Sequence, residues 1–376
     1  MEVIFLSAVF LVFHAYFGYP FSLRFVGLFR EKPVRKAPFL PSVTLIITAC
    51  NEEKRIAPKM ENTIHLEYPR DRLQVLVASD GSADRTNGIV AGYGNDGVEL
   101  LAIAQRRGKE NAQKEAVREA RGDILVFSDV ATRLDPDGLM QIVSNFADPS
   151  VGCVSSEDRL IGQDGKPGGE GLYVRYEMWL RRLESRVGSL VGLSGSFFAA
   201  RKEVCADFSE EMQSDFRTLL NSVRLGLRGV IDPEAVGYYT DIADEKKEFD
   251  RKVRTVLRGL TVFFRHLEFL NPLRFGFFSY QYACHKLLRW LVPFLLPVAL
   301  ATSAILSLHS IPYFVVFLGQ TAFYAIGAIG AVRGGRSWKG LWKIPVYFLT
   351  VNASILMAWE KFLRGDRVVM WTPSER

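Results

Sequence analysis

Polar segments follow three apolar runs that have the composition of buried β-strands. The three runs are residues 43–49, 74–78 and 123–128. Asn51 comes shortly after the first run, Asp80 after the second and Asp129 after the third. Ligands of open α/β sheets bind outside the carboxyl ends of the strands, and carboxylates there can hold a nucleoside and a divalent cation on its phosphates. We therefore predict a nucleotide-binding edge on a parallel sheet.

Strand and helix patterns alternate through the first part of the chain after residue 41. The predicted strands are 43–49, 74–78, 99–104 and 123–128, and the predicted helices are 52–64, 84–93, 109–121 and 136–146. Such alternation indicates an α/β fold, Rossmann-like, with a mostly parallel sheet and crossover helices. Residues 151–240 are less regular. There we expect helices within 173–190 and 209–226, a strand at 195–200 and a short strand at 230–231.

Long apolar runs lie near both ends of the chain. They cover residues 3–19, 290–308, 311–332 and, less cleanly, 344–359, and about 20 apolar residues suffice to cross a bilayer. The first run lacks a basic leader and a cleavage site, so it predicts a retained anchor. Buried core helices are the alternative for the later runs, but three in succession after a complete soluble domain disfavour it. The predicted organisation is an anchor (1–23), a basic, proline-containing linker (24–41), a soluble domain (42–244), interfacial amphipathic helices (245–288), two or three transmembrane helices (289–360) and a basic tail (361–376).

The distribution of charge predicts the orientation. Basic residues follow the first anchor at positions 24, 30, 32, 35 and 36, so the soluble domain should face the cytosol of an integral, multi-pass protein in a bacterial-type inner or plasma membrane. A complete fourth span would place Lys361 and Arg364 outside, so either that rule fails there or residues 344–359 only dip into the bilayer. The net charge of +6 suits anionic headgroups, since no nucleic-acid motif is present. The four cysteines lack metal-site spacing.

Several polar residues have the chemistry needed to transfer an activated sugar from a nucleoside diphosphate. Asp80 would hold the nucleoside, Lys109 would contact a phosphate, and Asp129 would bind a divalent metal that stabilises the departing diphosphate. Asp215, at the start of a predicted helix, is the best candidate for the base that accepts the acceptor's proton. Arg251 and Arg254 have forked donors for the diphosphate. Each residue alone is better explained as a turn, a helix cap or a basic face, but their order and spacing together favour the site.

This order of motifs resembles the inverting family-two glycosyltransferases with a GT-A fold, in particular the membrane-bound branch with cellulose, hyaluronan and poly-N-acetylglucosamine synthases. The motif residues are 48–53, 80–86, 108–112, 127–129, 214–215 and 251–255. The resemblance implies a metal-dependent hexosyltransferase that uses Mg²⁺ or Mn²⁺ and a nucleotide-sugar, most often a UDP-sugar. It implies donor-binding roles for Ala49, Asn51, Glu52, Asp80, Ser82, Arg107, Lys109, Asp129, Arg251 and Arg254, and a catalytic role for Asp215.

Two departures from the family pattern bear on metal binding and on the product. Ala131 stands where a second acidic metal ligand is usual, and Thr255 stands where processive synthases have a Trp beside the acceptor sugar. With few apolar segments after the catalytic domain, this favours transfer of one sugar to a lipid or lipid-linked acceptor at the cytosolic face, in envelope glycan or glycolipid synthesis. The aromatic and basic segment 251–285 would hold the site at the membrane. The alternatives are a processive polysaccharide synthase and a catalytically inactive GT-A scaffold.

Overall fold

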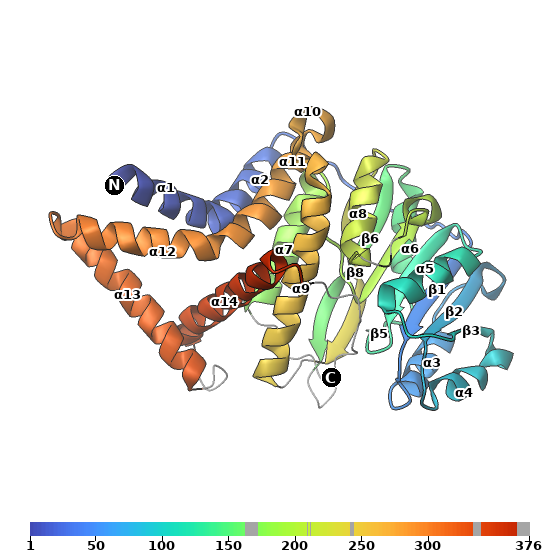
Figure 1. Ribbon diagram of the computed structural model, residues 1–376. Coiled ribbons are helices and arrows are strands. Elements are labelled where there is room, and N and C mark those ends of the chain that lie inside the picture. Colours follow the sequence, from blue (N-terminus) through green and yellow to red (C-terminus); the bar gives the residue numbers. More distant parts are fainter. Residues whose placement is uncertain (162–171, 209, 211, 241–243, 334–339, 367–376) are drawn as a thin grey trace. The chain divides into compact units, whose positions relative to one another are not determined.

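The computed structural model describes residues 1–161, 172–208, 210, 212–240, 244–333 and 340–366, and the chain divides into two compact units (Figure 1). The helical unit comprises Met1–Phe25 and Ile242–Val368. The sheet unit comprises Val26–Asp241 and Val369–Arg376. Each unit is described by itself below.

An eight-stranded sheet forms the centre of the sheet unit, with the strand order β3-β2-β1-β4-β7-β6-β8-β5. The strands are β1 (Val43–Ala49), β2 (Leu73–Asp80), β3 (Val98–Ile103), β4 (Ile124–Asp129), β5 (Arg133–Leu134), β6 (Val151–Ile161), β7 (Phe197–Arg201) and β8 (Arg228–Thr240). β1 to β4 are mutually parallel, as are β6 and β8, whereas β7 runs antiparallel to β4 and β6, and β5 antiparallel to β8. The predicted mostly parallel α/β sheet is thus confirmed.

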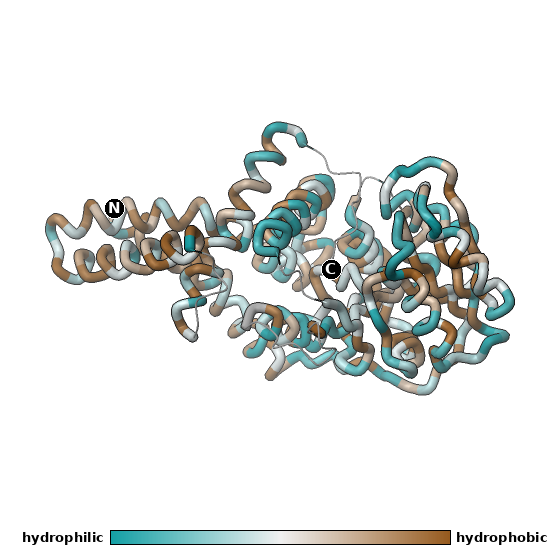
Figure 2. Tube along the Cα trace, turned by 90° about the horizontal axis from the view of Figure 1, so that it is seen from below, coloured by the Kyte–Doolittle hydropathy of each residue, from teal (hydrophilic) through white to brown (hydrophobic). Residues whose placement is uncertain are grey.

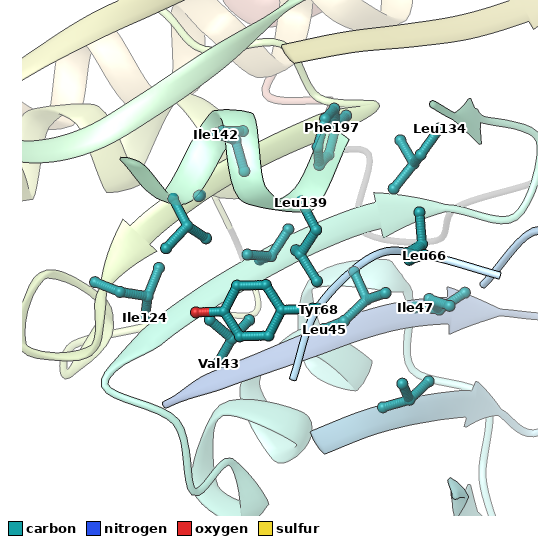
Figure 3. Packing of buried hydrophobic residues seen from close by; sticks show 14 of the residues in the cluster. Val43, Leu45, Ile47, Leu66, Tyr68, Ile124, Leu134, Leu139, Ile142 and Phe197 are labelled. Carbon is teal, nitrogen blue, oxygen red and sulfur yellow. The ribbon is translucent and has the colours of Figure 1, made fainter. Parts of the chain in front are cut away.

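Helices cover both faces of this sheet. They are α3 (Ile56–Ile64), α4 (Thr86–Ala91), α5 (Lys109–Glu119), α6 (Gly138–Ser144), α7 (Leu172–Val187) and α8 (Ser214–Arg224). One apolar cluster joins Leu45 and Ile47 of β1 to residues of α3, α4 and α6. Figure 3 shows Leu139 and Ile142 of α6 in this cluster. A second joins Ile46 to residues of α5, α7 and α8. Every residue of β1 is buried, and its sequence is apolar except for Thr44 and Thr48, as expected for a strand covered on both faces.

Two strands are longer than the sequence indicates. β6 has 11 residues, where no strand is predicted, and β8 has 13, where only a short strand at 230–231 is predicted. The polar residues of β6 and Pro233 of β8 interrupt the apolar pattern from which a strand is predicted. The two strands pair over ten register positions, and the pairing jumps from Ser156–Asp232 to Glu157–Val236, which leaves Pro233 in an irregularity. Proline is tolerated at such bulges, so non-local pairing prevailed over local composition.

The helical unit contains long apolar helices. The chain has four helices long and apolar enough to cross a membrane, by length and composition: Glu2–Gly27, Phe277–Leu306, Ile311–Val332 and Gly340–Leu363. The helix that starts at the marked N-terminus is largely hydrophobic along its length (Figure 2). These helices support an integral membrane protein. The second of them already begins at Phe277, within the segment expected to lie at the interface.

Other helices of this unit are amphipathic rather than uniformly apolar. α9 (Glu245–Arg265) begins at Asp244, whose carboxylate accepts hydrogen bonds from two backbone N–H groups of the first turn. Its buried apolar residues recur at helical spacing at positions 253, 257, 260 and 263, which gives one apolar face. α9 packs against α14 (Lys343–Leu363), and α1 (Glu2–Phe13) packs against α12 (Arg289–Leu306).

Candidate active site

The carboxyl ends of three neighbouring strands meet at one edge of the sheet. In the register of the ladder, Ala49 of β1 pairs with Ser79 of β2, and Thr48 of β1 pairs with Asp129 of β4. Asp80 is the last residue of β2 and Asp129 the last of β4. The structure therefore brings both aspartates to the same edge, one on each side of β1, where α/β folds bind their ligands.

The loops that follow β1 and β2 are hydrogen-bonded to each other. The Asn51 backbone N–H donates to Ser82 Oγ at 3.1 Å, and Asn51 Oδ1 accepts from the Ala83 N–H at 2.9 Å. The Glu52 N–H donates to Thr86 Oγ1 at 2.8 Å. Asn51 has a φ of 53°, a left-handed conformation that asparagine adopts more readily than most residues. The predicted donor-binding residues Asn51, Glu52 and Ser82 thus hold this loop pair together.

Glu52 is enclosed rather than presented to a ligand. Its side chain is 3% exposed, and its two carboxylate oxygens accept hydrogen bonds from the Arg55 guanidinium at 2.7 and 2.8 Å. Burial raises the pKa of Glu52 above its ordinary value, and the nearby carboxylates of Asp129 and Asp84 act in the same direction, whereas Arg55 lowers it. A ligand contact with this carboxylate would have to break the Arg55 pair.

The Asp80 carboxylate shapes the loop that leads into α5. Its Oδ1 accepts from the Arg107 backbone N–H and its Oδ2 from the Gly108 N–H, both at 2.8 Å, and the residue is 1% exposed. Gly81, next to it, has a φ of 60°, and a Cβ there would lie 2.6 Å from the Arg106 nitrogen, so only glycine fits. The Arg107 side chain, more than half exposed, pairs with Glu210 at 3.0 Å. Contact of Asp80 with a nucleoside stays a prediction.

Lys109 and Asp129 form an ion pair at the centre of the edge. The Lys109 ammonium contacts Asp129 Oδ1, and it also donates to the Gly195 carbonyl at 3.1 Å. Lys109 is the first residue of α5 and Asp129 is the last residue of β4. The ion pair therefore joins the start of α5 to the end of β4. The Lys109 side chain is 10% exposed and that of Asp129 29%, which leaves the carboxylate partly open to solvent.

The tripeptide Ser194–Ser196 connects this pair to the predicted base. Its Gly195 carbonyl accepts from Lys109, and its Ser196 carbonyl accepts from the Asp129 backbone N–H at 2.9 Å. A Cβ on Gly195 would lie 3.0 Å from Asp215 Oδ2. Asp215 lies in the first turn of α8, is 8% exposed and accepts from Gln213 Nε2 at 3.1 Å. Thus Asp215 lies beside the same tripeptide that holds Lys109 and Asp129.

The sequence interpretation missed two polar residues that support this edge, the buried Lys59 and the partly buried Asp158. Lys59 of α3, 3% exposed, donates to Ser128 Oγ at 2.7 Å and to the Thr132 carbonyl at 2.6 Å, on either side of Asp129. Burial lowers its pKa to about 7, against the attraction of Asp129. Asp158 of β6 accepts from the hydroxyl of Ser194 at 2.6 Å and from that of Ser196 at 3.0 Å.

The sequence positions of Lys59 and Asp158 could have marked them as structurally important. Lys59 lies beside Met60 and three positions after Ile56, on the apolar face of its helix. Asp158 lies in the polar stretch Ser155–Arg159, which interrupts an apolar run. A charged residue on a buried helix face needs a partner, and that requirement marks Lys59 as constrained.

The two predicted diphosphate-binding arginines belong to the helical unit. Arg251 lies in α9, where its guanidinium donates to both carboxylate oxygens of Glu248 at 2.7 and 2.8 Å. Arg254 lies one turn later on the same helix. Burial acts to raise the pKa of Glu248, but the hydrogen bonds and charge of Arg251 and the charge of Lys252 outweigh it and lower that pKa to about 2. The role of both arginines at a diphosphate stays a prediction.

The residues present fit a divalent cation only as a companion of the donor's phosphates. Among the described residues, no group of three or more His, Cys, Asp or Glu side chains is arranged to hold a metal, and Ala131 takes the place of a second carboxylate. Mg²⁺ is commonly held by one or two carboxylates together with substrate phosphates and water. The partly exposed Asp129 carboxylate suits that arrangement as a single protein ligand.

The part of the chain that forms this edge is similar in sequence to known glycosyltransferases. Residues 44–208 match the family described as "Glycosyl transferase family 2". A poly-beta-1,6-N-acetyl-D-glucosamine synthase from Staphylococcus aureus is 24% identical over 209 residues, which cover 54% of this chain and 50% of that protein. A beta-monoglucosyldiacylglycerol synthase from Trichormus variabilis is 24% identical over 185 residues, 47% of this chain and 40% of that protein. The chain therefore matches half or less of the length of these relatives.

A solved structure shares the fold over nearly the whole chain. It is the mannosyltransferase PcManGT from Pyrobaculum calidifontis, in complex with GDP-Man and Mn²⁺. The TM-score is 0.75 at 24% sequence identity, and the match covers 97% of this chain and 99% of that chain. At this identity the likeness shows the fold. The sheet domain around Asp80, Lys109 and Asp129 thus has a GT-A-like fold, and its residues 44–208 match glycosyltransferase family 2.

Proposed function

We propose that this chain is an inverting, membrane-bound glycosyltransferase. It moves one sugar from a nucleotide-diphosphate sugar to a hydroxyl of a lipid or lipid-linked acceptor at the cytosolic face of the membrane. The donor is a UDP-sugar, which the resembling family uses most often. The proposal depends on one observation: the tripeptide Ser194–Ser196 lies next to all three of Lys109, Asp129 and Asp215. The family 2 domain supports the reaction class.

The chemistry needs one general base and positive charge beside the leaving group. In an inverting transfer the acceptor oxygen bonds to the anomeric carbon from the face opposite the diphosphate, which leaves with the electrons of its C–O bond. Asp215 accepts the proton of the acceptor hydroxyl. Lys109 donates to a phosphate oxygen as negative charge develops there. A divalent cation, Mg²⁺ or Mn²⁺, bound with the donor at Asp129 would supply further charge stabilisation.

The lipid acceptor is inferred from the rest of the chain and from one relative. Four helices are long and apolar enough to cross a membrane, and α9 has one apolar face and a charged remainder. Such helices suit the membrane interface, where a lipid hydroxyl is presented. One relative is a beta-monoglucosyldiacylglycerol synthase. The poly-beta-1,6-N-acetyl-D-glucosamine synthase relative keeps processive polymer synthesis as the second candidate.

The test uses the full chain purified in detergent with a panel of nucleotide sugars and a total membrane lipid extract. Asp215→Asn should reduce transfer by about 10²–10⁴-fold while donor binding changes little. Asp207→Asn is the matched control, because Asp207 is an exposed aspartate that pairs with Arg217 near the start of the same helix.

The product decides between the candidates. Mass spectrometry of a radiolabelled, organic-soluble product with one added sugar supports the proposal. A long water-soluble polymer supports the processive synthase. Near-normal transfer by Asp215→Asn rejects the assigned base, and an absence of both transfer and donor hydrolysis across the panel favours an inactive scaffold.

A further inference from the structure

Lys109 contacts the Asp129 carboxylate, the group at this edge of the sheet that suits a divalent cation. The ammonium lies on Asp129 Oδ1, and a second hydrogen bond of 3.1 Å to the Gly195 carbonyl keeps it there. A cation that approaches this oxygen meets a positive charge already in contact with it. The two groups therefore compete for one site.

We propose that Lys109 is an internal counter-ion that makes cation binding at Asp129 conditional on the donor. In the donor-free protein the ammonium occupies Asp129 Oδ1, and its positive charge disfavours free Mg²⁺ or Mn²⁺ at the exposed part of the carboxylate. When a donor binds, its phosphates take the ammonium, and the carboxylate becomes open to the cation that accompanies them. This inference rests on the proposed function, because it assumes a diphosphate ligand at this edge.

The surroundings of the pair favour the block. Lys109 is largely buried, and ion pairs screened from water are stronger than exposed ones. A tethered ammonium also competes at a high effective concentration, since it pays no cost of association. Ala131 provides no second carboxylate that would hold a cation while Lys109 stays in place.

The same surroundings favour the exchange. An ammonium donates equally well to carboxylate and phosphate oxygens, because it is a compact charge with three donors. Lys109 is the first residue of α5, an 11-residue helix, and the start of a helix attracts anions such as phosphate. A donor diphosphate can thus replace Asp129 as the partner of Lys109 while the Gly195 hydrogen bond is kept.

The experiment measures Mn²⁺ binding without nucleotide, by electron paramagnetic resonance, on the full chain in detergent. Lys109→Met keeps the length of the side chain and removes its charge. It should bind Mn²⁺ about tenfold or more tightly than wild type, because the positive charge in contact with Asp129 Oδ1 is removed. The same variant should be slower in transfer, so affinity and activity move in opposite directions.

Three further variants secure the interpretation. Lys109→Arg keeps the charge and should keep Mn²⁺ binding weak. The double variant Lys109→Met, Asp129→Asn should lose the gain. Lys114→Met, which removes a lysine paired with Glu210 at 3.3 Å, should behave as wild type. Melting temperatures confirm that each variant is folded.

The outcomes separate this inference from the proposed function. Mn²⁺ affinity of Lys109→Met equal to that of wild type overturns the inference, even if the wild type transfers sugar. Tight Mn²⁺ binding by the wild-type protein in the absence of nucleotide overturns the inference as well. A tenfold gain that depends on Asp129, in a protein that transfers no sugar, supports the counter-ion role of Lys109 and rejects the proposed function.

Discussion

Lys59 should make the stability of the sheet unit depend on pH near neutrality. The side chain is fully buried, and its pKa falls from 10.5 to about 7. Between these two values the unfolded chain carries a proton on Lys59 that the folded chain lacks. Stability therefore rises with pH across this window, and below pH 7 the full cost of burying the ammonium applies.

The magnitude follows from the two pKa values. A pKa of about 7 in the folded protein, against 10.5 in the unfolded chain, gives a rise of about 1.4 kcal/mol in the free energy of unfolding between pH 6 and pH 8. For a unit of about 200 residues this corresponds to a change in Tm of roughly 3–6 °C. Lys59→Met should lack this contribution, although it also leaves Ser128 Oγ and the Thr132 carbonyl without their donor.

The assay is thermal unfolding of the full chain in detergent at several pH values, for wild type and Lys59→Met. The quantity to follow is the difference in Tm between the two proteins, because other titrating groups contribute equally to both. Lys54→Met is the control, since Lys54 is exposed on the preceding turn. A Tm difference that stays constant from pH 6 to pH 8 would refute the reasoning.

Three further predictions concern the loop, the base and the helical unit. Asp80→Asn places an amide against one of two backbone N–H donors, so it should cost about 1–3 kcal/mol in unfolding experiments and impair transfer. Gly195→Ala puts a methyl group 3.0 Å from Asp215 Oδ2; kcat should fall by up to about 100-fold with little change in donor affinity. Glu248, with its pKa lowered to about 2, contributes stability above pH 4.5 that is lost as pH falls toward 2, so Glu248→Gln should flatten the acid side of the Tm profile.

Much of the candidate site was predictable because it depends on strand ends. An apolar run followed by an acidic residue specifies which residue reaches the edge of a parallel sheet, and this was sufficient for Asp80 and Asp129. The hydrogen-bond and ion-pair partners of these two carboxylates were not predictable from the sequence. Asp80 is occupied by two backbone N–H groups and Asp129 by Lys109, and these contacts depend on loop conformations that no local pattern encodes.

The sequence by itself determined the alternation of strands and helices, the apolar helices at both ends and the polar segments at the strand ends, since each follows from local periodicity and composition. Only the tertiary structure decided the pairing of β6 with β8, the burial of Lys59 beneath Ser128 and Thr132, and the meeting of Asp215 with Lys109 and Asp129 at one tripeptide. These features join residues that lie far apart in the chain. Their energies come from desolvation and non-local hydrogen bonds, which arise only when the fold brings the partners together.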